Sequence, residues 1–329
     1  MMLSLLLTGC DFQGNHNTHQ QAKAEGFYFD TYCSIVAVDV DDPTVLQEAL
    51  DELERYESYF SNKRADSDIS KVNAAPVGQA VSVHPETIEL LQIAMDYGDK
   101  SQGAFDVTIG ALSNVWNFKN YDGTLPTEDE IQAAKATVDY QSLVVNPTDA
   151  TVTRTLEGSI IDLGGIAKGY AADRLTNYLE EQGVTKHTII NLGGNVRTIN
   201  EDTSWPCTIG IEKPFGEDNE VLCALQVINK SIVTSGTYQR YFEEDGIIYH
   251  HLLDTTTGKP IQNGLTSVTI MNDSSVDGDA LSTLCFCLGL EKGMDYVESL
   301  PDTEAIFVTS DGQMHCTSGM NQYQMKDAK

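Results

Sequence analysis

The chain has 329 residues, of which 41% are hydrophobic and 21% charged, values typical of a globular protein with one large domain or two. Its charge is unusual, because 20 Lys and Arg residues stand against 49 Asp and Glu residues, a formal net charge of −29. This charge repels nucleic acid and anionic lipid headgroups and attracts divalent cations. The composition therefore argues against a nucleic-acid-binding protein, and an anionic ligand would need backbone N–H groups, a lysine or a metal to bind.

The first ten residues form a short apolar run that ends in Leu7-Thr8-Gly9-Cys10. A small residue before a cysteine at the end of such a run resembles the lipobox of bacterial lipoproteins, in which the cysteine is lipidated. The alternative is an ordinary N-terminus with a free thiol. We expect residues 1–10 to be a signal remnant with Cys10 as the lipidation site, residues 11–25 a flexible tether, and residues 26–325 a folded domain.

The segments that follow alternate between strand and helix patterns. Residues 27–40 are apolar and β-branched around a polar interruption, which predicts a strand. Asp42 and Pro43 predict the cap and first position of a helix that runs to about Tyr59. Another helix is expected from near Pro85. This part of the chain therefore predicts helices packed on a sheet.

Two polar features of this region are candidates for a site. Asp66 and Ser67 lie in a polar loop, and both residue types are equally typical of turns and helix caps. Asp106 lies in the apolar segment Phe105-Asp106-Val107-Thr108. A carboxylate buried there must find a partner or a ligand, because an unpaired buried charge is costly.

The most informative motif is Asp162-Leu163-Gly164-Gly165-Ile166-Ala167-Lys168-Gly169, which joins an apolar strand-like run to a stretch of helical periodicity. A strand, a glycine turn and a helix point backbone N–H groups at an anion, and Lys168 could add its charge. The alternative is that the glycines only form a tight turn and that Lys168 is a solvated surface residue. The spacing matches neither the dinucleotide fingerprint nor the phosphate-loop motif, so neither a Rossmann fold nor an ATPase is predicted.

Two further patterns lie in the C-terminal third. His250 and His251 would face opposite ways on a strand, so they are not expected to bind one metal, but one of them could be a catalytic base. Asp279 and Thr283 lie one helical turn apart, and hard oxygen ligands at that spacing suit Mg²⁺. The alternative is that Asp279 caps its helix and Thr283 is incidental. Because the elements lack a regular βαβ period, we predict an α+β fold with mixed, largely antiparallel sheets and packed helices.

Cysteine usage and hydropathy add little. Of the seven cysteines, the six after Cys10 lack Cys-x-x-Cys spacing, which argues against a zinc site. Some of them could pair in an exported protein, although buried free thiols are the simpler expectation. No stretch after the N-terminus approaches the ~18–20 apolar residues of a membrane span.

Seven motifs in register resemble the ApbE flavin transferase family, over nearly the whole chain after the expected tether. Each motif alone is weak, but their common order is specific. In sequence they are Ser67-Asp68, Phe105-Asp106-x-Thr108, Asp162-Leu-Gly-Gly-Ile-Ala-Lys-Gly, Asn191-Leu-Gly-Gly, Ser235-Gly-x-Tyr, His251-x-x-Asp254 and Asp279-x-x-x-Thr283. The resemblance implies a T-fold-like α+β architecture and makes residues 26–325 a flavin transferase domain.

The resemblance also implies a reaction. FAD would be the substrate, Mg²⁺ would bind its pyrophosphate, and FMN would pass to a Thr or Ser hydroxyl of an acceptor flavoprotein domain while AMP leaves. Asp279, the Thr283 hydroxyl and a backbone carbonyl at Gly165 would hold the metal, and His251 would activate the acceptor hydroxyl. Contacts to the flavin nucleotide would come from Asp66, Ser67, Asp106, Lys168 and the backbone at Leu253.

Two positions depart from the family pattern. Many relatives carry Met-Gly-Thr where this chain has Phe29-Asp30-Thr31, and Lys63 stands where relatives often have an aromatic residue. The second departure bears on the balance between transfer and hydrolysis. Two other functions therefore stay open: an FAD pyrophosphatase that releases FMN and AMP, and a lipoprotein that only binds FAD. We expect the protein to be lipid-anchored at the outer face of a bacterial cell membrane.

Overall fold

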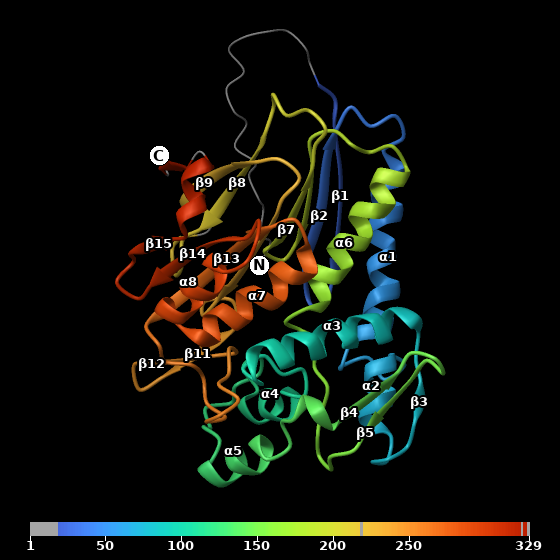
Figure 1. Ribbon diagram of the computed structural model, residues 1–329, viewed down its shortest axis with the longest axis vertical. Helices are drawn as coiled ribbons and strands as arrows, with labels where there is room; N and C mark the ends of the chain where they lie inside the picture. Colours follow the sequence, from blue (N-terminus) through green and yellow to red (C-terminus); the bar gives the residue numbers. More distant parts are fainter. Residues whose placement is uncertain (1–18, 218–219, 324, 328–329) are drawn as a thin grey trace.

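The computed structural model describes residues 19–217, 220–323 and 325–327. A large sheet forms the centre of the molecule, with helices across one face and a smaller lobe at one end (Figure 1). Neighbouring strands of this sheet are all antiparallel. In spatial order they are β1 (Gln21–Tyr28), β2 (Thr31–Val38), β6 (Thr188–Leu192), β7 (Asn195–Ile199), β10 (Ser231–Gly236), β13 (Leu265–Asn272), β14 (Glu304–Thr309) and β15 (Met314–Cys316). The predicted α+β fold with largely antiparallel sheets is confirmed.

Each face of the large sheet has its own hydrophobic core, because strand side chains alternate between the faces. Phe307 points into the core under the helices, whereas its neighbour Ile306 points to the other face. That other face is covered by a second antiparallel sheet of β8 (Cys207–Glu212), β9 (Val221–Val227) and β16 (Met325–Asp327). The helices on the first face are α1 (Thr44–Phe60), α6 (Ala167–Glu181), α7 (Ser275–Leu288) and α8 (Leu290–Glu298).

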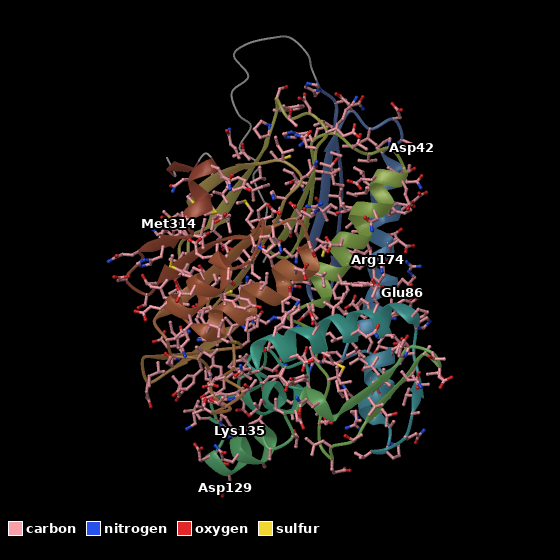
Figure 2. The ribbon with its side chains drawn as sticks, viewed as in Figure 1. Asp42, Glu86, Asp129, Lys135, Arg174 and Met314 are labelled. Carbon is pink, nitrogen blue, oxygen red and sulfur yellow. The ribbon has the colours of Figure 1, made fainter. Side chains whose placement is uncertain are left out.

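The smaller lobe joins these layers through α3 (Pro85–Ser101). Figure 2 places Arg174 of α6 near the boundary with this lobe, and its guanidinium bonds the carboxylate of Glu89 on α3. The lobe also contains α2 (Asp68–Ala74), α4 (Gly110–Trp116), α5 (Glu128–Lys135), a short 3-10 helix (Tyr140–Ser142) and the strands β3 (Val81–Ser82), β4 (Leu143–Asn146) and β5 (Thr151–Arg154).

A third hydrophobic cluster connects the lobe to the hairpin of β11 (Tyr241–Glu244) and β12 (Ile247–His250). Trp116 of α4 packs there with Phe242 and Leu253, and its indole N–H donates to the carbonyl of Gly258 at 2.8 Å. Lys135 of α5, labelled in Figure 2, donates to the Thr256 carbonyl at 2.7 Å. The loop that follows His250 is therefore fixed from two helices of the lobe.

The N-terminal part differs from the expectation in two ways. Residues 27–40 form not one strand but parts of the hairpin β1–β2, because Phe29 and Asp30 adopt positive φ angles of 50° and 61° and reverse the chain. β1 also begins at Gln21, inside the expected tether of residues 11–25, and Gln21 to Glu25 pair with β2. The expected lipidation site Cys10 lies outside the described residues.

The cysteines of the core behave as buried thiols. Cys33, Cys207 and Cys285 are buried and unbridged, and burial raises the pKa of each thiol to about 12. The expectation of buried free thiols is confirmed for these three. In the described part of the chain, no helix combines the length and the apolar character needed to cross a bilayer.

Candidate active site

The candidate site is built where α6 crosses α7. Gly169 lies in the first turn of α6, and a Cβ at this position would collide with the carbonyl oxygen of Ser275 in α7, so the close approach requires glycine. Asp173, one turn later, accepts hydrogen bonds from the backbone N–H groups of Ser275 at 2.8 Å and Val276 at 2.9 Å. Burial raises the pKa of Asp173, and these two donors oppose the shift. The first turn of α7 is thereby fixed against α6.

Asp279 of α7 faces the N-terminus of α6. Its Oδ2 accepts a hydrogen bond from the backbone N–H of Gly169 at 2.9 Å, and its Oδ1 lies 3.7 Å from the Lys168 ammonium. No side chain of the α6 segment itself caps this helix. The glycine motif was expected to point N–H groups at a bound anion, and for Gly169 that anion is the protein's own Asp279 carboxylate. The alternative that Asp279 caps its own helix is wrong, because Ser274 caps α7.

The residues expected to bind a metal lie together. Thr283 follows Asp279 by one turn, and its Oγ1 lies 3.2 Å from the Ser235 hydroxyl at the end of β10. Gly165 lies against the same side chain, because a Cβ added there would be 3.5 Å from the Thr283 Oγ1. Ser235 was not among the expected site residues, although the Ser235-Gly-x-Tyr motif marks its position. The structure thus brings a carboxylate and two hydroxyls to the start of α6.

This set of donors fits a magnesium ion that is also held by its substrate. Within the described ranges, no group of three or more His, Cys, Asp or Glu side chains could hold a metal. Asp279 is the one carboxylate among the three expected ligands, and the other two are the Thr283 hydroxyl and the Gly165 carbonyl. Mg²⁺ in enzymes is commonly bound by one or two carboxylates together with substrate phosphates. The chemistry of the donors therefore fits Mg²⁺ with a phosphate ligand better than a free metal ion.

His251 follows β12 directly and is held by one carbonyl group. Its backbone N–H donates to the Arg240 carbonyl at 3.1 Å, and its Nδ1 lies 3.3 Å from the same oxygen. Because a carbonyl only accepts, Nδ1 carries the proton and Nε2 keeps a lone pair. Burial, followed by the charges of Arg240 and His250, lowers the pKa of His251 to about 3, and the Lys168 ammonium adds to this effect. His251 is therefore a neutral imidazole in the field of Lys168.

The neighbouring His250 has a different role. Its side chain is buried, and its Nε2 donates to the Ile261 carbonyl at 2.8 Å. Burial lowers the pKa of His250 as well. Of the two histidines that the sequence offered as a base, His250 is thus part of the core, and His251 is the one beside the candidate site.

Several hydrogen bonds fix the loop after His251. The Asp254 carboxylate accepts hydrogen bonds from Thr256 and Thr257, and the Thr255 hydroxyl donates to the Gly103 carbonyl at 2.8 Å. The side chain of Leu253 is buried in the third hydrophobic cluster. The expected nucleotide contact at Leu253 concerns its backbone and stays a prediction.

Three other expected nucleotide contacts use their side chains within the protein. Asp106 accepts from the backbone N–H and hydroxyl of Thr108 at 2.7 and 2.6 Å and from the Tyr140 backbone N–H at 2.9 Å, and burial raises its pKa. Ser67 is fully buried and caps α2, while the exposed Asp66 pairs with Arg64 at 3.3 Å. Their roles at a nucleotide stay predictions.

The segment with Asp106 nevertheless lies next to the site. The ring of Phe105 would be 3.5 Å from a Cβ added to Gly165, so this segment and the glycine motif are in contact. Fold and site together define an α+β protein with oxygen donors at the crossing of two helices, and with a neutral histidine whose pKa is lowered in part by Lys168 of that site.

Comparison with known proteins extends this description. A profile of the ApbE family matches residues 29–307. The chain is 40% identical over 257 residues to a protein of Klebsiella pneumoniae (strain 342) named FAD:protein FMN transferase. The matched residues cover 78% of this chain and 79% of that protein. A protein of the same name from Vibrio cholerae is 31% identical over 303 residues, 90% of this chain and 88% of the relative.

Solved structures agree with these relatives. The ApbE protein of Thermotoga maritima superimposes with a TM-score of 0.84 at 30% identity, over 92% of this chain and 99% of that one. The flavin transferase ApbE from Vibrio cholerae gives a TM-score of 0.82 at 28% identity, over 93% and 100%. The chain belongs to the ApbE family. The predicted family and the prediction of an enzyme are thereby confirmed.

Proposed function

We propose that the protein transfers FMN from FAD to a Thr or Ser hydroxyl of an acceptor flavoprotein domain and releases AMP. The observation that carries this proposal is the neutral His251, whose Nδ1 proton is held by the Arg240 carbonyl and whose Nε2 is left as an acceptor. It lies in the field of Lys168, which pairs with Asp279. The relatives named FAD:protein FMN transferase support the same reaction.

Asp279, the Thr283 hydroxyl and the Gly165 carbonyl would hold Mg²⁺ in this proposal. When bound, the ion stabilises negative charge that develops on the pyrophosphate of FAD. Lys168 would contribute a second positive charge, since its ammonium lies at the same carboxylate. The proton transfer and the attack on phosphorus involve the side chains of this protein and the hydroxyl of the acceptor.

The proton of the acceptor hydroxyl passes to Nε2 of His251. The oxygen then forms a bond to the phosphorus of the FMN half, the bond from that phosphorus to the bridging oxygen breaks, and AMP leaves with the electron pair. A histidine with a low pKa is a weak base in the free protein, but two adjacent phosphates stabilise the imidazolium and raise the pKa when FAD binds. The Arg240 carbonyl keeps Nε2, rather than Nδ1, available for the proton.

One experiment separates the possible functions. The protein is incubated with FAD, Mg²⁺ and a candidate acceptor domain, and intact masses are recorded. An acceptor heavier by one FMN supports transfer, whereas free FMN and AMP with an unmodified acceptor indicate a pyrophosphatase. Unchanged FAD indicates a protein that only binds it. Hydrolysis is the second candidate because Lys63 stands where relatives often carry an aromatic ring. Its ammonium donates to the Asn114 side chain on α4 at 3.3 Å.

We also propose that a lipid on Cys10 anchors the protein at the outer face of the bacterial membrane. This proposal is supported by the Leu7-Thr8-Gly9-Cys10 pattern, in which a small residue precedes a cysteine at the end of an apolar run. Cys10→Ser should move the protein from the membrane fraction to the soluble fraction in a bacterial host. A variant that still fractionates with membranes would contradict the anchor.

A further inference from the structure

We infer that Lys168 is a positioning residue that keeps Asp279 paired until FAD arrives, so that the site admits the metal together with the pyrophosphate and binds free metal poorly. The inference rests on the proposed function and concerns the selectivity of the same site. It is carried by the contacts of Asp279 and by the finding that, in the described part of the chain, no group of three or more His, Cys, Asp or Glu side chains could hold a metal.

The two oxygens of Asp279 are in different environments. Oδ2 accepts the backbone N–H of Gly169, a fixed donor in the first turn of α6. Oδ1 faces the Lys168 ammonium at 3.7 Å, and this ammonium also donates to the Gly164 carbonyl at 3.3 Å. The Asp279 side chain is 5% exposed and that of Lys168 24% exposed. The oxygen that a metal would use is thus the one that a partly solvated cation already neutralises.

A free divalent cation meets two obstacles at this oxygen. It must come close to the ammonium of Lys168, and like charges at a few ångströms in a partly buried site repel strongly. Asp279 also brings only one negative charge, and among the described residues no group of three or more His, Cys, Asp or Glu side chains could hold the ion. A single carboxylate that is already paired is a poor ligand for a free ion.

The pyrophosphate of FAD removes both obstacles. It carries two negative charges, which balance a bound Mg²⁺ and give the Lys168 ammonium a new partner. The pair of Asp279 and Lys168 is neutral, and the same pair with Mg²⁺ and a pyrophosphate is neutral again. Metal alone or FAD alone would leave two uncompensated charges in a buried site, which is costly. The two ligands are therefore expected to bind cooperatively.

The test measures binding of Mn²⁺, a spectroscopic substitute for Mg²⁺, by its electron paramagnetic resonance signal without FAD. We expect Lys168→Met to bind Mn²⁺ at least about tenfold more tightly than the unchanged protein, because the competing cation is gone. The matched control is Lys119→Met, which removes the same charge from a lysine paired with Asp30 at 2.5 Å, and it should leave Mn²⁺ binding unchanged. Lys168→Arg retains the cation and should also behave like the unchanged protein.

Equal Mn²⁺ affinity of Lys168→Met and the unchanged protein would overturn the inference. Adding Asp279→Asn to Lys168→Met should abolish the gain, and a gain that persists would also overturn it, since the ion would then bind elsewhere. Lys168→Gln repeats the measurement if the methionine variant is unstable. The proposed function fails separately, if the unchanged protein with FAD, Mg²⁺ and acceptor yields no flavinylated product.

Discussion

Two buried carboxylates, Asp106 and Asp279, lie in neighbouring segments of the molecule and have different partners. Both oxygens of Asp106 accept hydrogen bonds from neutral donors, on Thr108 and Tyr140. Asp279 has one neutral donor, the Gly169 N–H, and its other oxygen faces the Lys168 ammonium. A carboxylate bound by fixed neutral donors stabilises a fold, whereas one balanced by a flexible cation can exchange that cation for a ligand. The partner of a buried carboxylate, more than its burial, indicates a site.

The largest expected effect tests the Asp279 side of this comparison. Asp279→Ala should reduce metal-dependent FAD turnover by about three orders of magnitude or more, because the only carboxylate of the proposed metal site is lost. It should also destabilise the protein by about 1 kcal/mol, because the N-terminus of α6 loses its cap. Turnover is measured by the appearance of AMP, and stability by urea denaturation.

Asp279→Asn separates these two effects. Its amide oxygen can still accept the Gly169 N–H, so the free energy of unfolding should stay near that of the unchanged protein while turnover is lost. Full activity in either variant would remove Asp279 from the metal site.

His251→Ala is expected to lower FMN transfer by about 10²–10⁴-fold, the usual contribution of a general base, and to leave FAD binding unchanged. Transfer is followed by the mass of the acceptor, and FAD binding by the fluorescence of the flavin. Arg240→Lys is the control, because it keeps the positive charge near His251 and its carbonyl still holds Nδ1. If His251→Ala transferred FMN at the normal rate, the base would have to be another group.

The Asp106 side of the comparison predicts a loss of stability. In Asp106→Asn the amide can accept from Thr108, but its NH₂ group would face the Tyr140 N–H, and two donors cannot bond. We expect the free energy of unfolding to fall by about 1–3 kcal/mol, the cost of a buried polar group without a partner. A rise in the KM for FAD in the fully folded variant would instead show the nucleotide contact that the family resemblance implies.

Local spacing predicted the parts of the site that lie on one element. Asp279 and Thr283 share a face of α7 because a helix repeats every 3.6 residues. The sequence did not predict that Asp279 would bond the N–H of Gly169, because this contact joins two helices far apart in the chain. The requirement for glycine at Gly169 was hidden for the same reason, since it depends on the Ser275 carbonyl.

The fold shows the same limit. The α+β class followed from the order of strand and helix patterns, but the turn at Phe29 and Asp30 was missed. A two-residue turn with positive φ is usually signalled by Asn-Gly or Asp-Gly, and neither Phe29 nor Asp30 is a glycine. β1 was missed in part because Gln21 to Glu25 contain no β-branched residue, although their pairing with β2 makes them a strand.

A smaller effect is expected at the hydroxyls beside Asp279. Ser235→Ala should raise the Mg²⁺ concentration needed for half-maximal turnover by about threefold to tenfold. The Thr283 hydroxyl loses its neighbour at 3.2 Å in this variant, and one hydrogen bond contributes about 1 kcal/mol. The measured quantity is the Mg²⁺ concentration that gives half-maximal turnover. Thr234→Val is the control, since its hydroxyl pairs with Thr269 instead. Equal shifts in both variants would point to a general effect on β10.

The smallest effect is expected from pH, and it distinguishes His251 from an ordinary histidine. An unperturbed imidazole loses its proton near pH 6.5, whereas the lowered pKa of His251 keeps it neutral in the free protein throughout pH 6–8. The titration of His251 should therefore change the kcat/KM for transfer by less than about twofold between pH 6 and pH 8. A decline in kcat/KM centred near pH 6.5, absent from His251→Gln, would show that the imidazole titrates normally.

The stability of the folded protein should respond to His251 at acidic pH, below the range in which transfer is measured. A folded-state pKa below the unfolded value means that the unfolded chain binds more protons at acidic pH, so His251 lowers stability as the pH falls from 6.5 towards 3. His251→Gln should lose less stability than the unchanged protein between pH 7 and pH 5 in urea denaturation, because glutamine does not titrate. An imidazole that lowers stability in acid and stays neutral at pH 7 is suited to accept a proton only when a negatively charged substrate lies beside it. The Asp106 carboxylate, by contrast, already accepts hydrogen bonds from Thr108 and Tyr140 within the protein.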